Sequence, residues 1–290
     1  MMIREPAVAG HFYPAHADRC RSDLQQLLGS APAPGAHERL YGGLVPHAGW
    51  MCSGHVAAEV FRALAASRSA KVVVLFGGVH RYRGREAALF GQGRWDTPLG
   101  PVDIDARLAE RILGHTNLIV DDPYAHEEEH SIEVQMPFVK VLFPEAKVLP
   151  LMVPMVKTAH EVGEAVARTL SAYDYDAIVV GTTDLTHYGP NYGFTPQGVG
   201  KEANTWAKEV NDRRLIELLV GLRSEELVAE ALERRNACSG GAAAATLAAV
   251  AAMGAGEGVV LTHTSSSEVL GGTMGREPDD SVGYVGIVFR

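Results

Sequence analysis

Four motifs that lie far apart in the chain hold side chains able to bind a metal ion or move a proton. His47 lies in VPHAGW, His80 ends VVVLFGGVH, Asp184 and His187 lie in GTTDLTHYG, and Cys238 lies in NACSGG. Imidazole and thiolate are common metal ligands, and imidazole exchanges protons near neutral pH. The alternative for each motif is structural, because a histidine can stabilise its own loop and a free cysteine is usually a small buried hydrophobe.

Two of these motifs have a spacing that favours chemistry. Asp184 and His187 are three residues apart, so on one turn they can face the same cavity. Asp184 can then ligate a hard metal or orient His187, which can transfer a proton. Cys238 precedes an alanine-rich helix, whose N-terminus lowers a thiol pKa. The adjacent Ser239 and glycines are equally compatible with an anion-binding or helix-capping turn.

Residues 121–138, DDPYAHEEEHSIEVQMPF, combine carboxylates with two histidines. We expect most of these carboxylates to be solvated at a helix start, where they suit the helix dipole. His130, Glu133 and Gln135 are the members that can instead enter a pocket. The aromatic residues assigned to the substrate side of such a pocket are Phe12, Tyr13, Trp50 and Tyr188, with anchoring or core packing as the alternative.

Alternating strand and helix patterns must position these motifs. Apolar runs typical of buried strands cover 71–78, 146–153 and 176–183, with weaker or terminal strands at 40–46, 259–266 and 281–289. Helical spacing covers 53–68, 158–170, 204–220, 224–235 and 239–253. The pattern predicts one α/β domain over residues 1–290, an α/β/α sandwich with a mixed central sheet. Ligands of such sheets bind at the carboxyl ends of the strands, where the four motifs are expected to meet.

Local signals add detail to this prediction. Ser53 is the expected N-cap of the helix at 53–68, and Thr158 with Glu161 fits a capping box. Residues 94–105 are typical of an antiparallel excursion, and residues 31–37, APAPGAH, are expected to form a loop.

Composition excludes several classes of protein. The 290 residues are 47% hydrophobic and carry 26 basic against 35 acidic side chains, so the formal net charge is −9. That charge creates no overall field for nucleic acid or an anionic membrane. The apolar stretch 242–253 is shorter than the roughly 20 residues of a membrane span, and the N-terminus has no signal-peptide core. Three scattered cysteines suit a reducing cytoplasm.

Taken in order, the combined motifs resemble the Memo family, whose bacterial and archaeal members are called AmmeMemoRadiSam system protein B. The motifs are REPAVAGHFYP, VPHAGWMCSGHVAAEVF, GGVH, EEEHSIEVQMPF, GTTDLTHYGPNYGF and ACSGG. The resemblance runs from about residue 4 to the last strand. That family is similar in fold to the LigB-like class III extradiol dioxygenases, which implies a metal pocket at one end of the sheet.

The resemblance implies that His47, His80 and Cys238 bind the metal. It implies catalytic roles for Asp184 and His187 beside the metal, with His130 as a further catalytic candidate in the pocket wall. The dioxygenases use two histidines and a glutamate, whereas a cysteine stands here in place of the carboxylate. The resemblance implies Fe(II) as the metal. Because a thiolate is a softer ligand than a carboxylate, copper or zinc can compete with it.

The expected function is therefore a metal-dependent oxidoreductase acting on an unknown small molecule. A second hypothesis is a non-catalytic adaptor that binds phosphopeptides in the same pocket, although Arg81, Arg83 and Arg85 are the nearest basic group. A third follows from the family name: a subunit that acts with a radical-SAM partner and an AMMECR1-like protein.

Overall fold

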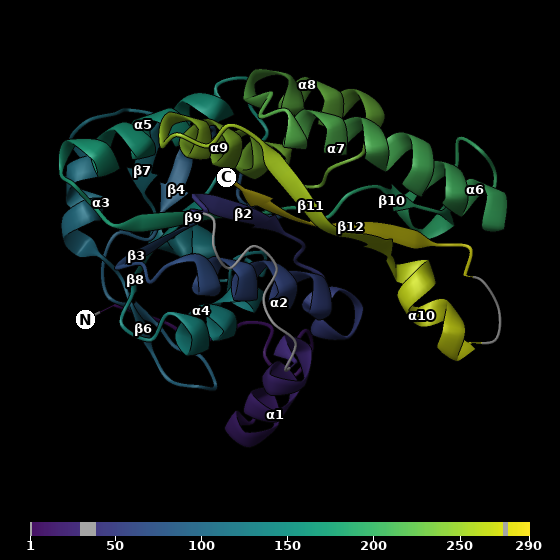
Figure 1. Ribbon diagram of the computed structural model, residues 1–290, viewed down its shortest axis with the longest axis horizontal. Coiled ribbons are helices and arrows are strands. Elements are labelled where there is room, and N and C mark those ends of the chain that lie inside the picture. The colour runs from purple at the N-terminus through teal and green to yellow at the C-terminus, as the bar shows by residue number, and fades with distance from the viewer. Residues whose placement is uncertain (1, 30–38, 275–277) are drawn as a thin grey trace.

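The computed structural model describes residues 2–29, 39–274 and 278–290 (Figure 1). The helices are α1 (Ala17–Leu28), α2 (Trp50–Ser67), α3 (Ala106–Leu113), α4 (Met136–Leu142), α5 (Ala159–Ala172), α6 (Lys201–Trp206), α7 (Arg213–Val220), α8 (Ser224–Arg234), α9 (Gly240–Ala252) and α10 (Ser266–Met274). Short 3₁₀ turns cover η1 (Pro123–His126), η2 (Glu133–Gln135) and η3 (Pro190–Tyr192), and η4 (Ala207–Asp212) is a π-helical turn. The loop expected at 31–37 lies outside the described residues.

The strands form one large mixed sheet and one small sheet. They are β1 (Ile3–Arg4), β2 (Gly42–Val45), β3 (Val72–Gly77), β4 (Ala87–Leu89), β5 (Arg94–Trp95), β6 (Val102–Asp103), β7 (Ile119–Asp121), β8 (Lys147–Met152), β9 (Ala177–Thr182), β10 (His187–Tyr188), β11 (Gly258–Ser265) and β12 (Ser281–Phe289). The large sheet has the order β10-β12-β2-β9-β3-β8-β4-β7, and β11 pairs with β12. Strands β2, β9, β3 and β8 are parallel, whereas β12 is antiparallel to β2.

Helices cover both faces of the large sheet, as the sequence predicts. Along β3, Val72, Val74 and Phe76 pack in the core shared with α3, α5 and α9. Val73 and Leu75 alternate with them and pack toward α2 and α4. Figure 1 shows α5 and α9 on one side of the sheet and α2 and α4 on the other. The predicted α/β/α sandwich with a mixed sheet is therefore confirmed, and strands buried on both faces explain its continuous apolar runs.

Two local predictions are wrong. Helix α2 begins at Trp50 with Gly49 as its N-cap, where the Trp50 N–H donates to the Phe12 carbonyl at 2.8 Å; the Ser53 hydroxyl donates to the Ala48 carbonyl. Thr158 is the N-cap of α5, but its side chain makes no capping hydrogen bond, so no capping box forms. The helical structure expected at 204–220 is present, but it begins at Lys201 and includes the π turn η4 between α6 and α7.

Other predicted features are confirmed. Strands β5 and β6 pair antiparallel within residues 94–105. Within the described ranges, every helix falls short of the length and apolarity required to cross a bilayer.

Candidate metal centre

The parallel core brings three of the four motifs to one edge of the sheet. Val45 of β2 pairs with Thr182 of β9, and Phe76 of β3 pairs with Gly181, so the carboxyl ends of these strands are level. His47, His80 and Asp184 follow those ends within three residues. Cys238 reaches the same place because it precedes α9, which packs on this part of the sheet.

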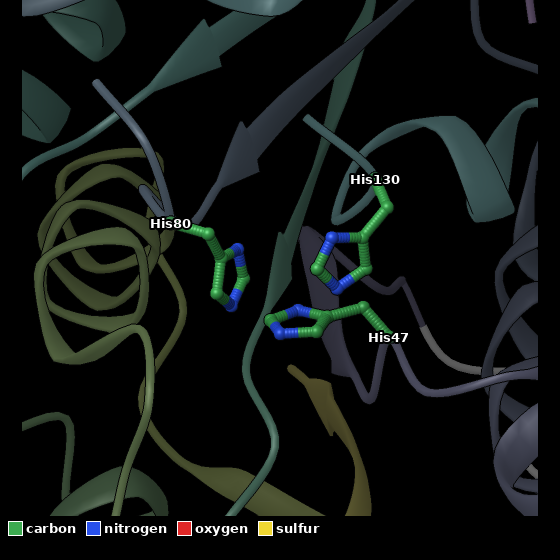
Figure 2. A group of neighbouring side chains, drawn as sticks. All are labelled: His47, His80 and His130. Atoms are coloured by element: carbon green, nitrogen blue, oxygen red, sulfur yellow. The ribbon is translucent and has the colours of Figure 1, made fainter. Parts of the chain in front are cut away.

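Three imidazoles converge at this edge. Each of His47, His80 and His130 offers one ring nitrogen, and these nitrogens lie within 4.8 Å of one another (Figure 2). Nitrogens that share a tetrahedral ion lie about 3.4 Å apart, at bonds of about 2.1 Å. The three rings are therefore near enough to bind one metal ion after side-chain movements that bring them closer together.

The Cys238 thiol lies beside the same imidazoles. Its Sγ is 3.2 Å from His47 Nε2 and also hydrogen bonds to His80. The Asp184 N–H donates to this sulfur at 3.3 Å, and the Cys238 N–H donates to the Asp184 carbonyl at 3.2 Å. The structure thus places Cys238 next to His47, whereas the three donors that lie within 4.8 Å of one another are His47, His80 and His130.

Outer partners orient two of the rings. The His47 ring uses Nδ1 to contact the Thr182 hydroxyl, which leaves Nε2 for the centre. The His80 ring uses Nδ1 to contact Glu129 Oε1 at 2.9 Å, and the His80 backbone N–H donates to Glu129 Oε2 at 2.9 Å. A hydrogen-bonded outer nitrogen is the usual arrangement for a histidine that binds metal. Thr182 and Glu129 are functional residues that the sequence interpretation missed.

Glu129 also sets the electrostatics of the metal-free centre. Burial opposes the charged form of His80, but its hydrogen bonds with Cys238 and Glu129 raise its pKa to about 9. The same pairing holds the Glu129 pKa well below its usual range despite burial. Burial and the nearby His47 and His80 rings lower the pKa of His130 to about 4, so this ring is neutral at pH 7. A neutral ring has a lone pair available for a metal.

Most carboxylates of residues 121–138 are exposed or partly exposed, as the sequence predicts. Glu129 and Glu133 are the exceptions, at 3% and 1% exposed. Glu133 does not enter the pocket; its oxygens accept hydrogen bonds from Arg4 Nη1 at 2.6 Å and from the Ala7 N–H, the Val8 N–H and the Tyr13 hydroxyl at 2.9 Å each. These partners lie far from Glu133 in the sequence, so the alternation of acidic and apolar residues in this segment could not predict that Glu133 is buried against them.

The predicted aromatic residues divide between the centre and its support. The Phe12 ring lies 4.9 Å from the His130 ring, at the centre itself. Tyr13 is buried against Glu133, and the Trp50 indole donates to the Val134 carbonyl at 3.0 Å, so both stabilise the wall behind it. Gln135 ties this wall to the His47 loop by donating to the Pro46 carbonyl at 2.8 Å.

Asp184 and His187 do not form the pair that their spacing suggests. Asp184 Oδ1 accepts the His47 backbone N–H at 2.8 Å, which fixes the His47 loop. His187 instead places Nδ1 3.2 Å from the Leu185 carbonyl, and its ring lies 5.0 Å from that of Tyr192. Burial lowers the pKa of His187, which favours a neutral ring able to accept a proton.

A cavity of about 420 Å³ joins His187 to the centre, because His80 and Cys238 also line it. Tyr188, the neighbour of His187, is absent from this lining among the described residues. Its hydroxyl donates to the Gly198 carbonyl at 3.0 Å, and its ring packs with Phe194 and Trp206. The structure therefore places Tyr188 in the support of the wall.

Comparisons with known proteins agree with the geometry. The family description "Memo-like protein" matches residues 4–288. The chain is 36% identical to a MEMO1 family protein of Methanopyrus kandleri over 100% of this chain and 99% of that one. It is 32% identical to a MEMO1 family protein of Nitrosopumilus maritimus over 99% and 100% of the two chains. The crystal structure of an uncharacterised Escherichia coli K12 protein is similar in fold, with a TM-score of 0.51 and 11% identity over 86% of this chain and 99% of that one.

Proposed function

Because the chain belongs to the Memo-like family and gathers three imidazoles at one point, with a thiol beside His47, we propose that it is a metal-dependent oxidoreductase that binds Fe(II). The proposed ligands are His47, His80 and Cys238, with His130 beside them. The observation that carries the proposal is the convergence of three imidazoles from distant parts of the chain. Structural histidines rarely meet in such a group with their outer nitrogens already bonded.

The donor set suits a first-row transition metal. Imidazole and thiolate ligands favour iron, copper or zinc over magnesium or calcium. Three protein ligands leave positions open on the ion. Bound Fe(II) or copper would supply redox chemistry with oxygen, whereas zinc would supply only a Lewis acid. The class III extradiol dioxygenases, to which the family is similar in fold, provide the precedent for an iron centre at this sheet edge.

The protein's own groups can bind and deprotonate a small substrate at this place. His187 faces the cavity opposite His80 and Cys238, and its neutral ring can accept a proton from a substrate hydroxyl. Asp184 and Glu129 hold the His47 loop and the His80 ring in position. His47 and Asp184 are 1% and 4% exposed, so the inner side of the centre excludes water.

The other hypotheses have less support from the described residues. Arg81 is ion-paired with Glu128, and the arginines at 81, 83 and 85 do not line the cavity, which disfavours a phosphopeptide pocket there. A complex with a radical-SAM protein and an AMMECR1-like protein stays a prediction that co-purification tests. The three cysteines are free thiols, as a reducing cytoplasm requires.

Metal analysis after purification without oxygen tests the proposal. We expect about one iron per chain in the wild type, lost in His47→Ala and in Cys238→Ala. His160→Ala is the matched control, because His160 is partly exposed on α5, away from the centre, where its ring contacts the Lys157 carbonyl. Oxygen consumption with a panel of catechols then tests the reaction. A wild type without bound metal would overturn the proposal, and metal without turnover would exclude ring cleavage of those catechols.

A further inference from the structure

The cavity beside the metal centre is lined by two chemically different groups of residues. His80, His187 and Cys238 belong to the candidate site. The remaining lining consists of Met155, Tyr192, Ala231, Leu232, Arg235 and Ala237. Its volume of about 420 Å³ lies within the range of small-molecule sites.

The walls of this cavity are mainly apolar, and one residue stands out by its charge. Leu232 on α8 is 59% exposed and contributes apolar surface to this lining. Arg235 is the only lysine or arginine among the described lining residues. A ligand in this cavity therefore meets apolar surface along its length and a single permanent positive charge.

Arg235 lies at a backbone position that favours glycine or asparagine over arginine. It ends α8 in the left-handed conformation, with φ at 54°. Glycine or asparagine is preferred at such a helix end, because a side chain is strained there. An arginine kept at a strained position beside a cavity indicates a role for its guanidinium.

The guanidinium is held in place and still has donors to offer. Nη1 donates to the Gly193 carbonyl at 3.0 Å and Nη2 to the Tyr192 carbonyl at 3.1 Å. Its central carbon lies 4.6 Å from the centre of the Phe194 ring. These two bonds use two of its five N–H groups, so three remain for an anion. A pre-positioned guanidinium loses little entropy when it binds one.

We propose that the cavity binds a small molecule with an apolar, ring-sized body and one carboxylate, and that Arg235 binds the carboxylate. The body then packs on Leu232 and Met155, and the far end of the molecule reaches His187 and the metal centre. This inference rests on the proposed function, for which it names the substrate class. A single guanidinium matches one carboxylate, whereas a phosphate dianion usually requires several cationic groups.

Calorimetric titration with three matched compounds tests the inference. The probes are 3-phenylpropionate, its neutral amide 3-phenylpropanamide, and 2-phenylethyl phosphate. The full-length protein is first treated with a chelator, so that the carboxylate cannot bind a metal instead. We expect the carboxylate to bind about tenfold tighter than the amide, the ratio that one charge-assisted hydrogen bond supplies. The preference should fall as salt is added.

Variants separate binding from support of the fold. In Arg235→Gln the carboxylate and the amide should bind equally, within about twofold, whereas a structural role of Arg235 would weaken both alike. If Arg235→Gln does not fold, the same titrations are made with Arg235→Lys, which keeps the positive charge. Arg234→Gln is the matched control, because Arg234 pairs with Glu233 and does not line the cavity.

Three results would overturn the inference: no preference for the carboxylate in the wild type, a preference that survives in Arg235→Gln, or tighter binding of the phosphate. None of these results depends on metal content. Iron measured in Arg235→Gln therefore shows separately whether the proposed function holds, and we expect it to equal that of the wild type.

Discussion

His80 and His130 lie together in one wall of the site, Asp184 and His187 belong to a second wall that follows β9, and the supports of these walls differ. The first wall is held by a charged group that we call the N-terminal clamp: Arg4, Tyr13, Glu129 and Glu133. The second is held by a group that we call the π-turn clamp: Thr186, Asn211, Asp212 and Asn236.

The N-terminal clamp acts directly on a ring that faces the metal. Arg4 pairs with Glu133 and also donates to the Glu129 carbonyl at 2.8 Å. Glu129 in turn contacts the His80 ring, whose pKa it helps to raise. The first wall therefore couples a buried ion pair to the orientation and charge of a proposed ligand.

The π-turn clamp acts on Thr186, the residue before His187, and not on the His187 ring. Asp212 Oδ1 accepts the Thr186 N–H at 2.9 Å, and Asn211 donates to the Thr186 hydroxyl at 3.0 Å. Because π turns often occur at functional sites, the irregular helix here is consistent with a positioning role. The two clamps therefore differ in what they hold: the first contacts the His80 ring itself, whereas the second fixes the chain next to His187.

The largest expected effect comes from breaking the N-terminal clamp. Glu133→Ala leaves the Arg4 guanidinium buried without its carboxylate, so the free energy of unfolding should fall by about 3–5 kcal/mol. Urea unfolding measures this change. Glu164→Ala removes an exposed partner of Arg168 and should cost less than about 1 kcal/mol. A loss of equal size in the two variants would show that burial of the clamp contributes nothing special.

The second largest expected effect is a loss of stability at acid pH that comes from the first wall. His126 lies within the first wall, is fully buried, and burial lowers its pKa to about 3. The unfolded chain binds a proton near pH 6.5, so stability falls as the pH drops from about 6.5 toward 3, by up to about 1.4 kcal/mol per pH unit. Unfolding of chelator-treated His126→Gln should show a weaker dependence over this range. An unchanged slope would mean that His126 is not the group that titrates.

The smallest expected effect distinguishes the two clamps by metal affinity. Glu129→Gln weakens the contact that orients His80, so metal binding should weaken by about 10- to 100-fold. Asp212→Asn keeps a similar shape and alters contacts to the Thr186 N–H and the His263 ring, neither of which belongs to the three imidazoles of the centre, so its metal affinity should stay within about twofold. Competition with a chelator measures both values. If Asp212→Asn weakened binding as much as Glu129→Gln, the difference between the walls would disappear.

The amino-acid sequence was sufficient for the layers of the fold and for the edge that carries the centre. Strands such as β3 and β9 are continuous apolar runs, and the helices have their own periodicity, so each element can be recognised from its own residues. Parallel strands end at one edge, which places His47, His80 and Asp184 near one another without knowledge of side-chain contacts.

Only the tertiary structure decided how these residues are supported and which additional groups join them. The burial of Glu129 and Glu133 depends on Arg4, more than a hundred residues away, and no local pattern distinguishes a solvated carboxylate from a paired one. The early start of α2 depends likewise on the Phe12 carbonyl. Local sequence determines which hydrogen-bonding groups a segment has, but distant packing determines which of those groups lose water and need a partner.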